Sequence, residues 1–264
     1  MSHLPLRGRA TCIARCAALL ALLSVPAGAA PLSVSDGTAT VTADDQHGGL
    51  TNFILGGVDH LFQADYYFRT SSMTLEQALT GTTSSVVDSV AATSPTEITV
   101  MGTATGFTYT IVYWLDGAGR MRSSLDIQNT TGSPLTITVF NYQDWDVNNT
   151  AGGDSIVWNG FDILQTQGST VIQVTPQQTP DVIQAGAFSG IRNQLRDGNV
   201  DNLTPTGLPF GPGDGTFAFQ FNLVIPTGGG GTIIYSVPEP STGVLAALGL
   251  IALAWWGRDR RLRA

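Results

Sequence analysis

The densest group of polar side chains that could do chemistry lies just past the middle of the chain. Asp144 and Asp146 stand two residues apart, and Asn148 and Asp154 follow them. Residues two apart in a strand project from the same face, so the first two carboxylates would lie side by side. Carboxylate and amide oxygens are the hard ligands that Ca²⁺ prefers. This segment predicts either a Ca²⁺ site or a solvated loop whose Asn and Asp residues stabilise turns.

Two more specific interpretations of these carboxylates have little support. In an EF-hand loop the sixth position is Gly and the twelfth is Glu, whereas this segment has Asn149 and Ser155 there. Side chains this close on one strand also rarely lie on both sides of a glycosidic bond.

Residues for nucleophilic catalysis are scarce. The chain has no Lys and no Gly-x-Ser-x-Gly motif, and its two cysteines, Cys12 and Cys16, both lie in the N-terminal segment. His47 and His60 could transfer protons, but neither stands in a recognisable catalytic pattern. We therefore predict that the protein is not an enzyme and needs no cofactor, with Ca²⁺ as the one ligand to test.

Aromatic residues could instead form platforms that stack on sugar rings. At alternating strand positions they belong more often to a hydrophobic core, and the sequence favours that interpretation. The residues concerned are Trp114, Trp145, Trp158, Tyr66, Tyr67 and Tyr113.

The elements that must position these side chains have the period-two pattern of β-strands. Two alternating runs flank Asp36-Gly37, which is a strong hairpin signal. Short polar turns between strands predict an all-β, antiparallel β-sandwich. One helix is predicted, at 72–79, and 176–212 reads as a long surface excursion or functional loop. Strands are predicted at 32–35, 38–42, 51–55, 64–70, 86–91, 97–103, 107–115, 121–128, 135–145, 155–158, 170–174, 216–225 and 232–236.

The charge balance of the central part excludes one class of partner. Residues 30–236 hold 18 Asp and Glu against 5 Arg. Such a surface repels nucleic acid and attracts divalent cations, although net charge alone also keeps an exported protein soluble. We expect no nucleic-acid partner.

The N-terminal segment has the three-part layout of a secretory signal peptide. Three arginines precede an apolar run at 17–25, and small residues follow it. Cleavage by signal peptidase between Ala29 and Ala30 fits best, which makes 1–29 the signal peptide and leaves a secreted part without cysteine.

The C-terminal segment predicts a single transmembrane helix. Residues 243–256 hold no charge, and with their neighbours they are just long enough to span a bilayer. The arginines that follow resist translocation and should stay cytoplasmic. These stop-transfer residues are Arg258, Arg260, Arg261 and Arg263.

Pro238, Glu239 and Pro240 stand immediately before this apolar segment. The order Pro-Glu-Pro, apolar span, Arg-rich end resembles the PEP-CTERM sorting signal. The resemblance implies that 30–236 is a secreted domain and 237–264 a tail that an exosortase cuts. It also implies export across the inner membrane, transient anchoring by the tail, and delivery to the cell surface or extracellular matrix, where such proteins are linked to exopolysaccharide and biofilm.

A second resemblance concerns the secreted domain. Turn placement around His47-Gly48-Gly49 and Gly56-Gly57, and again through 113–146, is similar to the β-sandwich of galactose-mutarotase-like domains. That family implies proton transfer by histidines with a carboxylate, yet His47 and His60 both lie near the start of the domain. Three hypotheses stay open: a structural or adhesive surface protein, a carbohydrate-binding or Ca²⁺-dependent adhesion module, and a carbohydrate-active enzyme.

Overall fold

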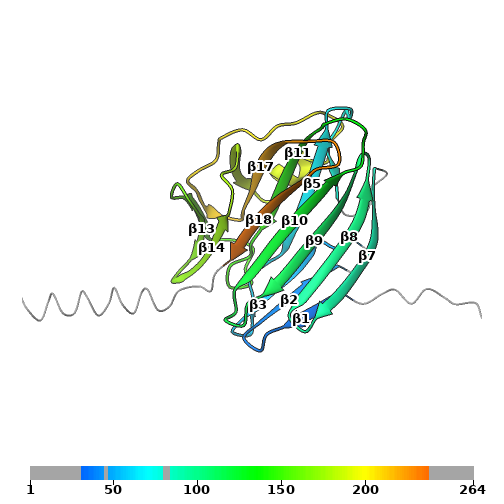
Figure 1. Cartoon of the computed structure of the whole chain (residues 1–264). Helices are drawn as coiled ribbons and strands as arrows, with labels where there is room; N and C mark the ends of the chain where they lie inside the picture. The colour runs from blue at the N-terminus through cyan, green and yellow to red at the C-terminus, as the bar shows by residue number, and fades with distance from the viewer. Residues whose placement is uncertain (1–30, 45–46, 80–83, 238–264) are drawn as a thin grey trace, which may run out of the picture.

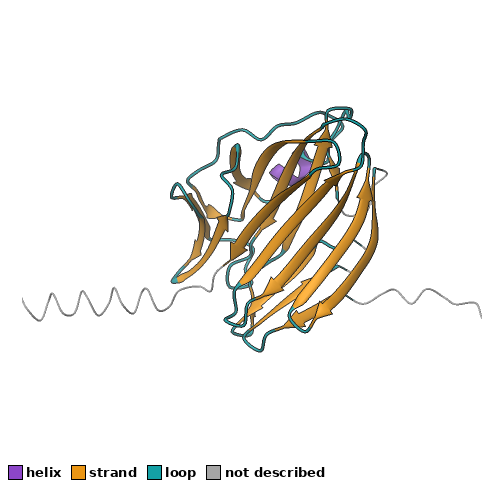
Figure 2. Ribbon diagram, viewed as in Figure 1, coloured by secondary structure: helices purple, strands orange, loops and turns teal. Residues whose placement is uncertain are grey.

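The computed structural model describes residues 31–44, 47–79 and 84–237. Strands are the main element of this part of the chain (Figure 1), and the one helix among the described residues is short (Figure 2). The elements are β1 Leu32–Ser35, β2 Ala39–Ala43, β3 Leu50–Leu55, β4 Val58–Asp59, β5 Gln63–Thr70, β6 Gln77–Ala78, β7 Ser85–Ser94, β8 Glu97–Ala104, β9 Phe107–Leu115, β10 Met121–Asn129, β11 Leu135–Asp144, β12 Asp154–Trp158, β13 Ile163–Gln167, β14 Thr170–Pro176, β15 Val182–Ala187, α1 Gly190–Gln194, β16 Phe210–Gly213, β17 Gly215–Ile225 and β18 Gly230–Val237.

The strands form two antiparallel sheets packed face to face, which confirms the predicted all-β sandwich. The first sheet has the order β1-β2-β3-β5-β11-β17-β15, with β4 on β3 and β6 on β5. The second sheet has the order β16-β12-β13-β14-β18-β10-β9-β8-β7. The last strand, β18, therefore lies inside the second sheet, between β14 and β10 (Figure 1).

Alternation of side chains explains why these segments become strands. In β9 every second residue from Phe107 to Leu115 is buried, and the residues between them are exposed or half-buried. The predicted hairpin over Asp36-Gly37 is also confirmed, because β1 pairs with β2 in register. Its turn is held by Asp36, whose Oδ1 accepts hydrogen bonds from the amides of Thr38 and Ala39 at 2.8 Å each.

The main hydrophobic core lies between the inner faces of the two sheets. Edge-to-face aromatic pairs connect its parts: the ring centroids of Phe53 and Trp145 are 5.9 Å apart, and those of Phe68 and Phe107 are 5.1 Å apart. Such pairs contribute roughly 0.5–1.5 kcal/mol beyond the burial of their area.

One sequence prediction was wrong, and a second was incomplete. Residues 72–79 form turns and the short strand β6 rather than a helix, because Glu76 pairs with Arg69 and β6 pairs with β5. The interval 176–212, predicted as a long surface excursion or functional loop, contains β15, α1 and part of β16.

Predictions about the two ends of the chain lie outside the described residues. They include the signal peptide with Ala29 and Ala30, the sorting motif with Pro238 to Pro240, and the membrane helix with its arginines. The division at 29 and 236 stays a prediction. In the described ranges no helix is long and apolar enough to cross a bilayer.

Candidate functional site

The outer face of the first sheet carries polar side chains where it meets α1 and the loop after it. Alternation along β5 puts Gln63, Asp65, Tyr67 and Arg69 on this face, opposite Tyr66 and Phe68 of the core. The register pairs Asp65 with Tyr142 and Gln63 with Asp144 on β11. These residues form a polar strip across neighbouring strands.

A second, smaller apolar cluster covers part of this face. Ile191 of α1 and Leu195 and Leu203 beyond it pack on the outward side chains of β5, β11 and β17. The covered residues include Tyr67 and Phe140, both fully buried. The strands are thus buried on both faces here, and polar groups beside the cluster lose contact with water.

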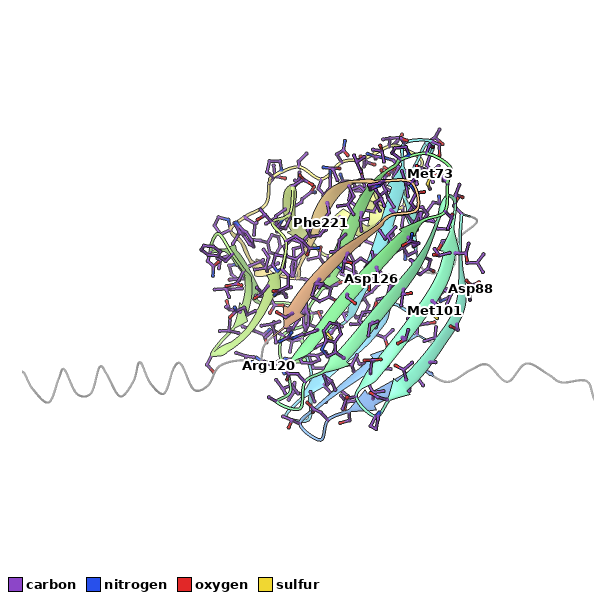
Figure 3. The ribbon with its side chains drawn as sticks, in the orientation of Figure 1. Met73, Asp88, Met101, Arg120, Asp126 and Phe221 are labelled. Atoms are coloured by element: carbon purple, nitrogen blue, oxygen red, sulfur yellow. The ribbon has the colours of Figure 1, made fainter. Side chains whose placement is uncertain are left out.

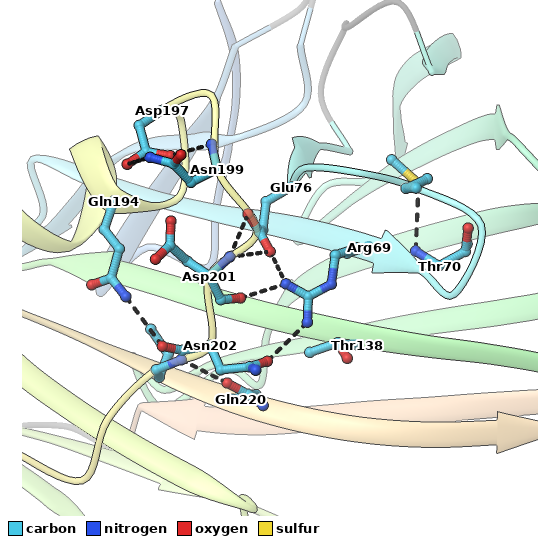
Figure 4. Close-up of polar contacts among 12 residues, drawn as sticks. Arg69, Thr70, Glu76, Thr138, Gln194, Asp197, Asn199, Asp201, Asn202 and Gln220 are labelled. Atoms are coloured by element: carbon cyan, nitrogen blue, oxygen red, sulfur yellow. Dashed lines mark hydrogen bonds and ion pairs between the residues drawn. The ribbon is translucent and has the colours of Figure 1, made fainter.

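The loop after α1, which we call the covering loop, is held on the sheet by hydrogen bonds to a buried ion pair, as Figure 4 shows. Arg69 pairs with buried Glu76, and it also donates to the carbonyl oxygen of Asp201 at 2.5 Å. The second guanidinium nitrogen donates to Asn202 Oδ1 at 2.8 Å. The amide of Asp201 returns hydrogen bonds of 3.1 and 3.2 Å to the Glu76 carboxylate. The loop is therefore held by charge-assisted bonds that water reaches poorly.

A pocket of about 510 Å³ opens beside this ion pair. Tyr67 lines it with its hydroxyl buried and without a hydrogen-bond partner among the described residues, while the Arg196 guanidinium carbon lies 5.6 Å from the centre of the Tyr67 ring. The residues lining it are Asp44, His47, Gly49, Leu50, Thr51, Asp65, Tyr67, Leu75, Glu76, Gln77, Ala78, Leu195 and Arg196.

Asp65 is the buried carboxylate of this pocket. Burial raises its pKa, although the Gln63 side chain donates a hydrogen bond to it and Arg196, His47 and Arg192 lie near enough to oppose the shift. Gly49 makes room for it, since a Cβ at that position would collide with Asp65 Oδ1. The pocket can therefore present a carboxyl group, a guanidinium and a free phenol to one polar ligand.

A second cluster of charge lies where β11 ends and β17 begins. Oxygens of Asp144, Asp146 and Asp214 lie within 4.8 Å of one another. Burial raises the pKa of Asp144 to about 7, and the charges of Asp146 and Asp214 add to the shift. Asp146 and Asp214 also have raised pKa values because of burial. We call Asp144, Asp146 and Asp214 the acidic cluster.

Asp154 is held beside the acidic cluster by Gln165. The Gln165 side-chain nitrogen donates to Asp154 Oδ2 at 2.7 Å and to the carbonyl oxygens of Trp145 and Gly215 at 2.6 and 3.3 Å. Those carbonyls belong to residues next to the cluster's own aspartates. Burial raises the pKa of Asp154 to about 6, and the charges of Asp146 and Asp214 contribute.

The predicted ligand set is partly brought together. Asp144 and Asp146 lie side by side, with Asp154 nearby, as their spacing indicates. The Asn148 side chain instead bonds Thr170, at 2.9 Å, and the carbonyl of Gln167, at 3.4 Å. Asp214 was missed because it lies far along the chain, at a turn with no metal-binding pattern. Whether the group binds Ca²⁺ stays a prediction.

The two histidines lie in different surroundings. His47 stands at the rim of the pocket, with its Nδ1 3.2 Å from Asp44. His60 is buried, its Nδ1 accepts a hydrogen bond of 3.1 Å from the Asn148 amide, and burial lowers its pKa. They do not line one pocket in the described part of the chain. The absence of enzymatic activity stays a prediction.

Most of the aromatic candidates are core residues, as the sequence favoured. Trp145, Tyr66, Tyr67 and Tyr113 are fully buried or nearly so. Trp158 is only half-buried and lines a separate pocket of about 710 Å³.

Comparison with known sequences identifies the end of the chain. Residues 236–261 match the PEP-CTERM protein-sorting motif, which confirms the resemblance. The motif marks an exported protein that an exosortase processes and sorts to the cell surface. No match to a curated protein was found.

Comparison with solved structures identifies the fold. The chain is similar to a bacterial glucoamylase complexed with acarbose (TM-score 0.57, 9% identity, 81% of this chain and 32% of that one). It is similar to a polysaccharide lyase (TM-score 0.52, 9% identity, 76% of this chain and 32% of that one). It is also similar to a galactose mutarotase-like protein from Lactobacillus casei ATCC 334 (TM-score 0.50, 8% identity, 79% of this chain and 99% of that one). The chain spans about a third of the length of the first two. At these identities the likeness shows the fold alone, a β-sandwich that resembles those of galactose-mutarotase-like proteins.

Proposed function

We propose that this exported protein is a non-enzymatic surface protein that binds polysaccharide outside the cell through the pocket on the outer face of its first sheet. The observation that carries the proposal is the convergence of Asp65, Tyr67 and Arg196 on one opening of about 510 Å³. A structural or adhesive role in a biofilm matrix would follow from such binding.

The pocket suits a sugar for physical reasons. Binding sites fix a ligand with a few placed polar groups, and sugar hydroxyls both donate and accept hydrogen bonds. The Tyr67 hydroxyl lacks a partner among the described residues, so a ligand hydroxyl could satisfy it. The names of the three similar structures also refer to carbohydrates, which supports the ligand class and not the residues.

The surroundings of the second carboxylate favour binding over hydrolysis. A glycosidase of the usual kind needs two carboxylates free to act on the bond. Glu76 is engaged by Arg69 and by the amide of Asp201. Asp44, the third carboxylate lining the pocket, is engaged by the amide and the ring of His47, which leaves Asp65 as the available carboxyl group.

Glycan-array screening of the full-length chain in detergent, followed by calorimetry with the best oligosaccharide, tests this proposal. Tyr67→Phe and Asp65→Asn should each weaken binding about fivefold or more, the loss of one hydrogen bond. Asp126→Asn, on the exposed face of the other sheet, is the matched control and should bind as the unaltered protein does. Equal binding by all variants would place the glycan elsewhere.

A carbohydrate-active enzyme is the second candidate, favoured by Asp65. A buried carboxyl group with a raised pKa is what a general acid requires. Reducing-end release and optical rotation, measured on the same oligosaccharide, distinguish the candidates. Turnover that disappears in Asp65→Asn while binding persists would establish an enzyme.

Processing is tested by the intact mass of the protein from cells with and without their exosortase. We expect signal peptidase to remove 1–29, and the tail to be lost near Pro238 to Pro240 only when exosortase is present. A tail retained in both would make this a membrane-anchored protein.

A further inference from the structure

The acidic cluster leaves oxygen atoms without partners in a buried position. Asp144 is 1% exposed; its Oδ2 accepts a hydrogen bond of 3.1 Å from Tyr142, and its Oδ1 has no partner among the described residues. Asp154 Oδ1 and Thr216 Oγ1 are likewise buried without partners there. Thr216 faces Asp144 across the β11–β17 pair. Orphaned buried oxygens are costly unless a ligand or ion meets them.

The spacing of the carboxylates fits one shared cation. Oxygens that bind the same Ca²⁺ at roughly 2.3–2.6 Å can be no more than about 5 Å apart. The three carboxylates of the acidic cluster each offer an oxygen within 4.8 Å of the others. They come from the end of β11, the residue after Trp145 and the residue before β17, so the fold and not one loop brings them together.

Basic side chains do not neutralise this group. Neither the three aspartates of the acidic cluster nor Asp154 forms an ion pair with a described Arg or His. Arg192 is close enough to lower the pKa of Asp144, but its Nη1 donates to Gln63 at 2.8 Å and its Cζ lies 5.4 Å from the centre of the Phe188 ring. Mutual repulsion between the carboxylates is therefore only partly offset, by Arg192 at Asp144.

Surrounding contacts hold the ligands in place and leave a path to them. The Gln165 side chain holds Asp154 and the carbonyl oxygens of Trp145 and Gly215 by donating a hydrogen bond to each. Asp146 and Asn149 also line a small pocket of about 180 Å³, which gives an ion room to approach Asp146. Ligands fixed by a second layer of hydrogen bonds, with an entry path, are what a metal site requires.

We propose that Asp144, Asp146 and Asp214 bind one Ca²⁺ ion, with Asp154 and Thr216 as adjacent oxygen donors. Carboxylate and hydroxyl oxygens are hard ligands, and Ca²⁺ tolerates the irregular geometry of ligands from separate strands better than Mg²⁺ does. The ion would link β11, β17 and the β12–β13 hairpin. This site is separate from the proposed glycan pocket and does not depend on it.

Titration calorimetry of CaCl₂ into the chelator-treated full-length chain in detergent tests the site. We expect one ion per chain, with MgCl₂ binding more weakly, and a higher melting temperature in CaCl₂ than in EDTA. Terbium luminescence gives a second readout, because Trp145 lies between two of the ligands and should sensitise a bound ion that Ca²⁺ then displaces. Absence of binding by the unaltered protein would overturn the proposal.

Asp146→Asn and Asp214→Asn locate the ion. Both residues are half-buried, so these isosteric variants should fold, which far-ultraviolet circular dichroism in EDTA checks. Each should weaken Ca²⁺ binding by ~10-fold or more. Asp88→Asn and Asp126→Asn, acids on the second sheet, are controls and should bind as the unaltered protein does. Folded Asp146→Asn and Asp214→Asn variants with unchanged affinity would put the ion elsewhere and refute the assignment.

Discussion

The outer faces of the two sheets are built from similar alternating strands but meet different surroundings. On the second sheet, Asp126 of β10 and Met101 of β8 lie open to solvent, as Figure 3 shows. On the first sheet, α1 and the loop after it cover β5, β11 and β17, and Asp65 and Asp144 become buried. The strands alone do not make a candidate site; the covering segment does, because it removes water from charged groups that the strands would otherwise expose.

The largest difference should appear when one ion pair is broken on each surface. Arg69→Met leaves the buried Glu76 carboxylate without its guanidinium and should cost about 3–5 kcal/mol in the free energy of unfolding. Arg120→Met breaks the exposed pair with Asp116, 2.8 Å apart in the β9–β10 turn, and should cost no more than ~1 kcal/mol. Urea unfolding followed by tryptophan fluorescence measures both. Equal losses would mean that the covering loop does not desolvate Glu76.

The next largest difference in stability between the two outer faces should appear when one apolar side chain is truncated on each. Leu195→Ala opens a cavity under the covering loop and should cost ~2–5 kcal/mol, since Leu195 is 1% exposed. Met101→Ala truncates a side chain that is 51% exposed and should change stability by no more than about 0.5 kcal/mol. Thermal unfolding of the two variants side by side gives the comparison, and a Leu195→Ala effect as small as that of Met101→Ala would contradict it.

A smaller effect is expected from the pH dependence of stability. Burial raises the pKa of Asp65 above its ordinary 3.8, so between these values the folded state keeps a proton that the unfolded state releases. The contribution of Asp65 is therefore most favourable below the ordinary pKa and is lost as pH rises through the raised one. Asp65→Asn should stabilise the protein at pH 8, have little effect at pH 4, and reduce the slope between them in urea unfolding.

Part of the pH dependence of stability should remain in Asp65→Asn. The pKa values of Asp144 and Asp154 are also raised, to about 7 and 6, so these groups too lower stability as pH rises. A slope identical to that of the unaltered protein would show that Asp65 is solvated.

On the covered face itself, a small effect on stability is expected from Tyr67→Phe. The Tyr67 hydroxyl is buried without a partner in the described part of the chain, so deleting it should change stability by less than about 1 kcal/mol in either direction. Thermal unfolding should therefore show a near-neutral variant even where glycan binding falls. A loss above ~2 kcal/mol would reveal a hydrogen bond that serves the fold.

The sequence predicted the strands better than it predicted the site. Period two identified β9 and β11 because each buries a full inner face. It missed β13 and β15, where Gln and Gly residues interrupt the apolar pattern. The helix predicted at 72–79 failed because the pairing of β6 with β5, and the contacts of Glu76 with Arg69 and with the distant Asp201, outweighed local periodicity.

Only those residues of the candidate site that lie close together along the chain could be predicted from the sequence. Asp144 and Asp146 are two residues apart, so alternation alone placed them together. Asp214 reaches them through the pairing of β11 with β17, and Arg196 reaches Tyr67 through the loop after α1. Sequence spacing contains no information about such approaches, since they depend on which strands become neighbours.

The position of β18 fixes an order of events during export. This final strand lies between β14 and β10, and the residues that match the sorting motif begin at its end. The second sheet cannot close until the last strand has left the translocation channel, because its neighbours lack each other's hydrogen bonds until then. Assembly of the sandwich is thus postponed to the end of translocation, when the sorting tail follows directly.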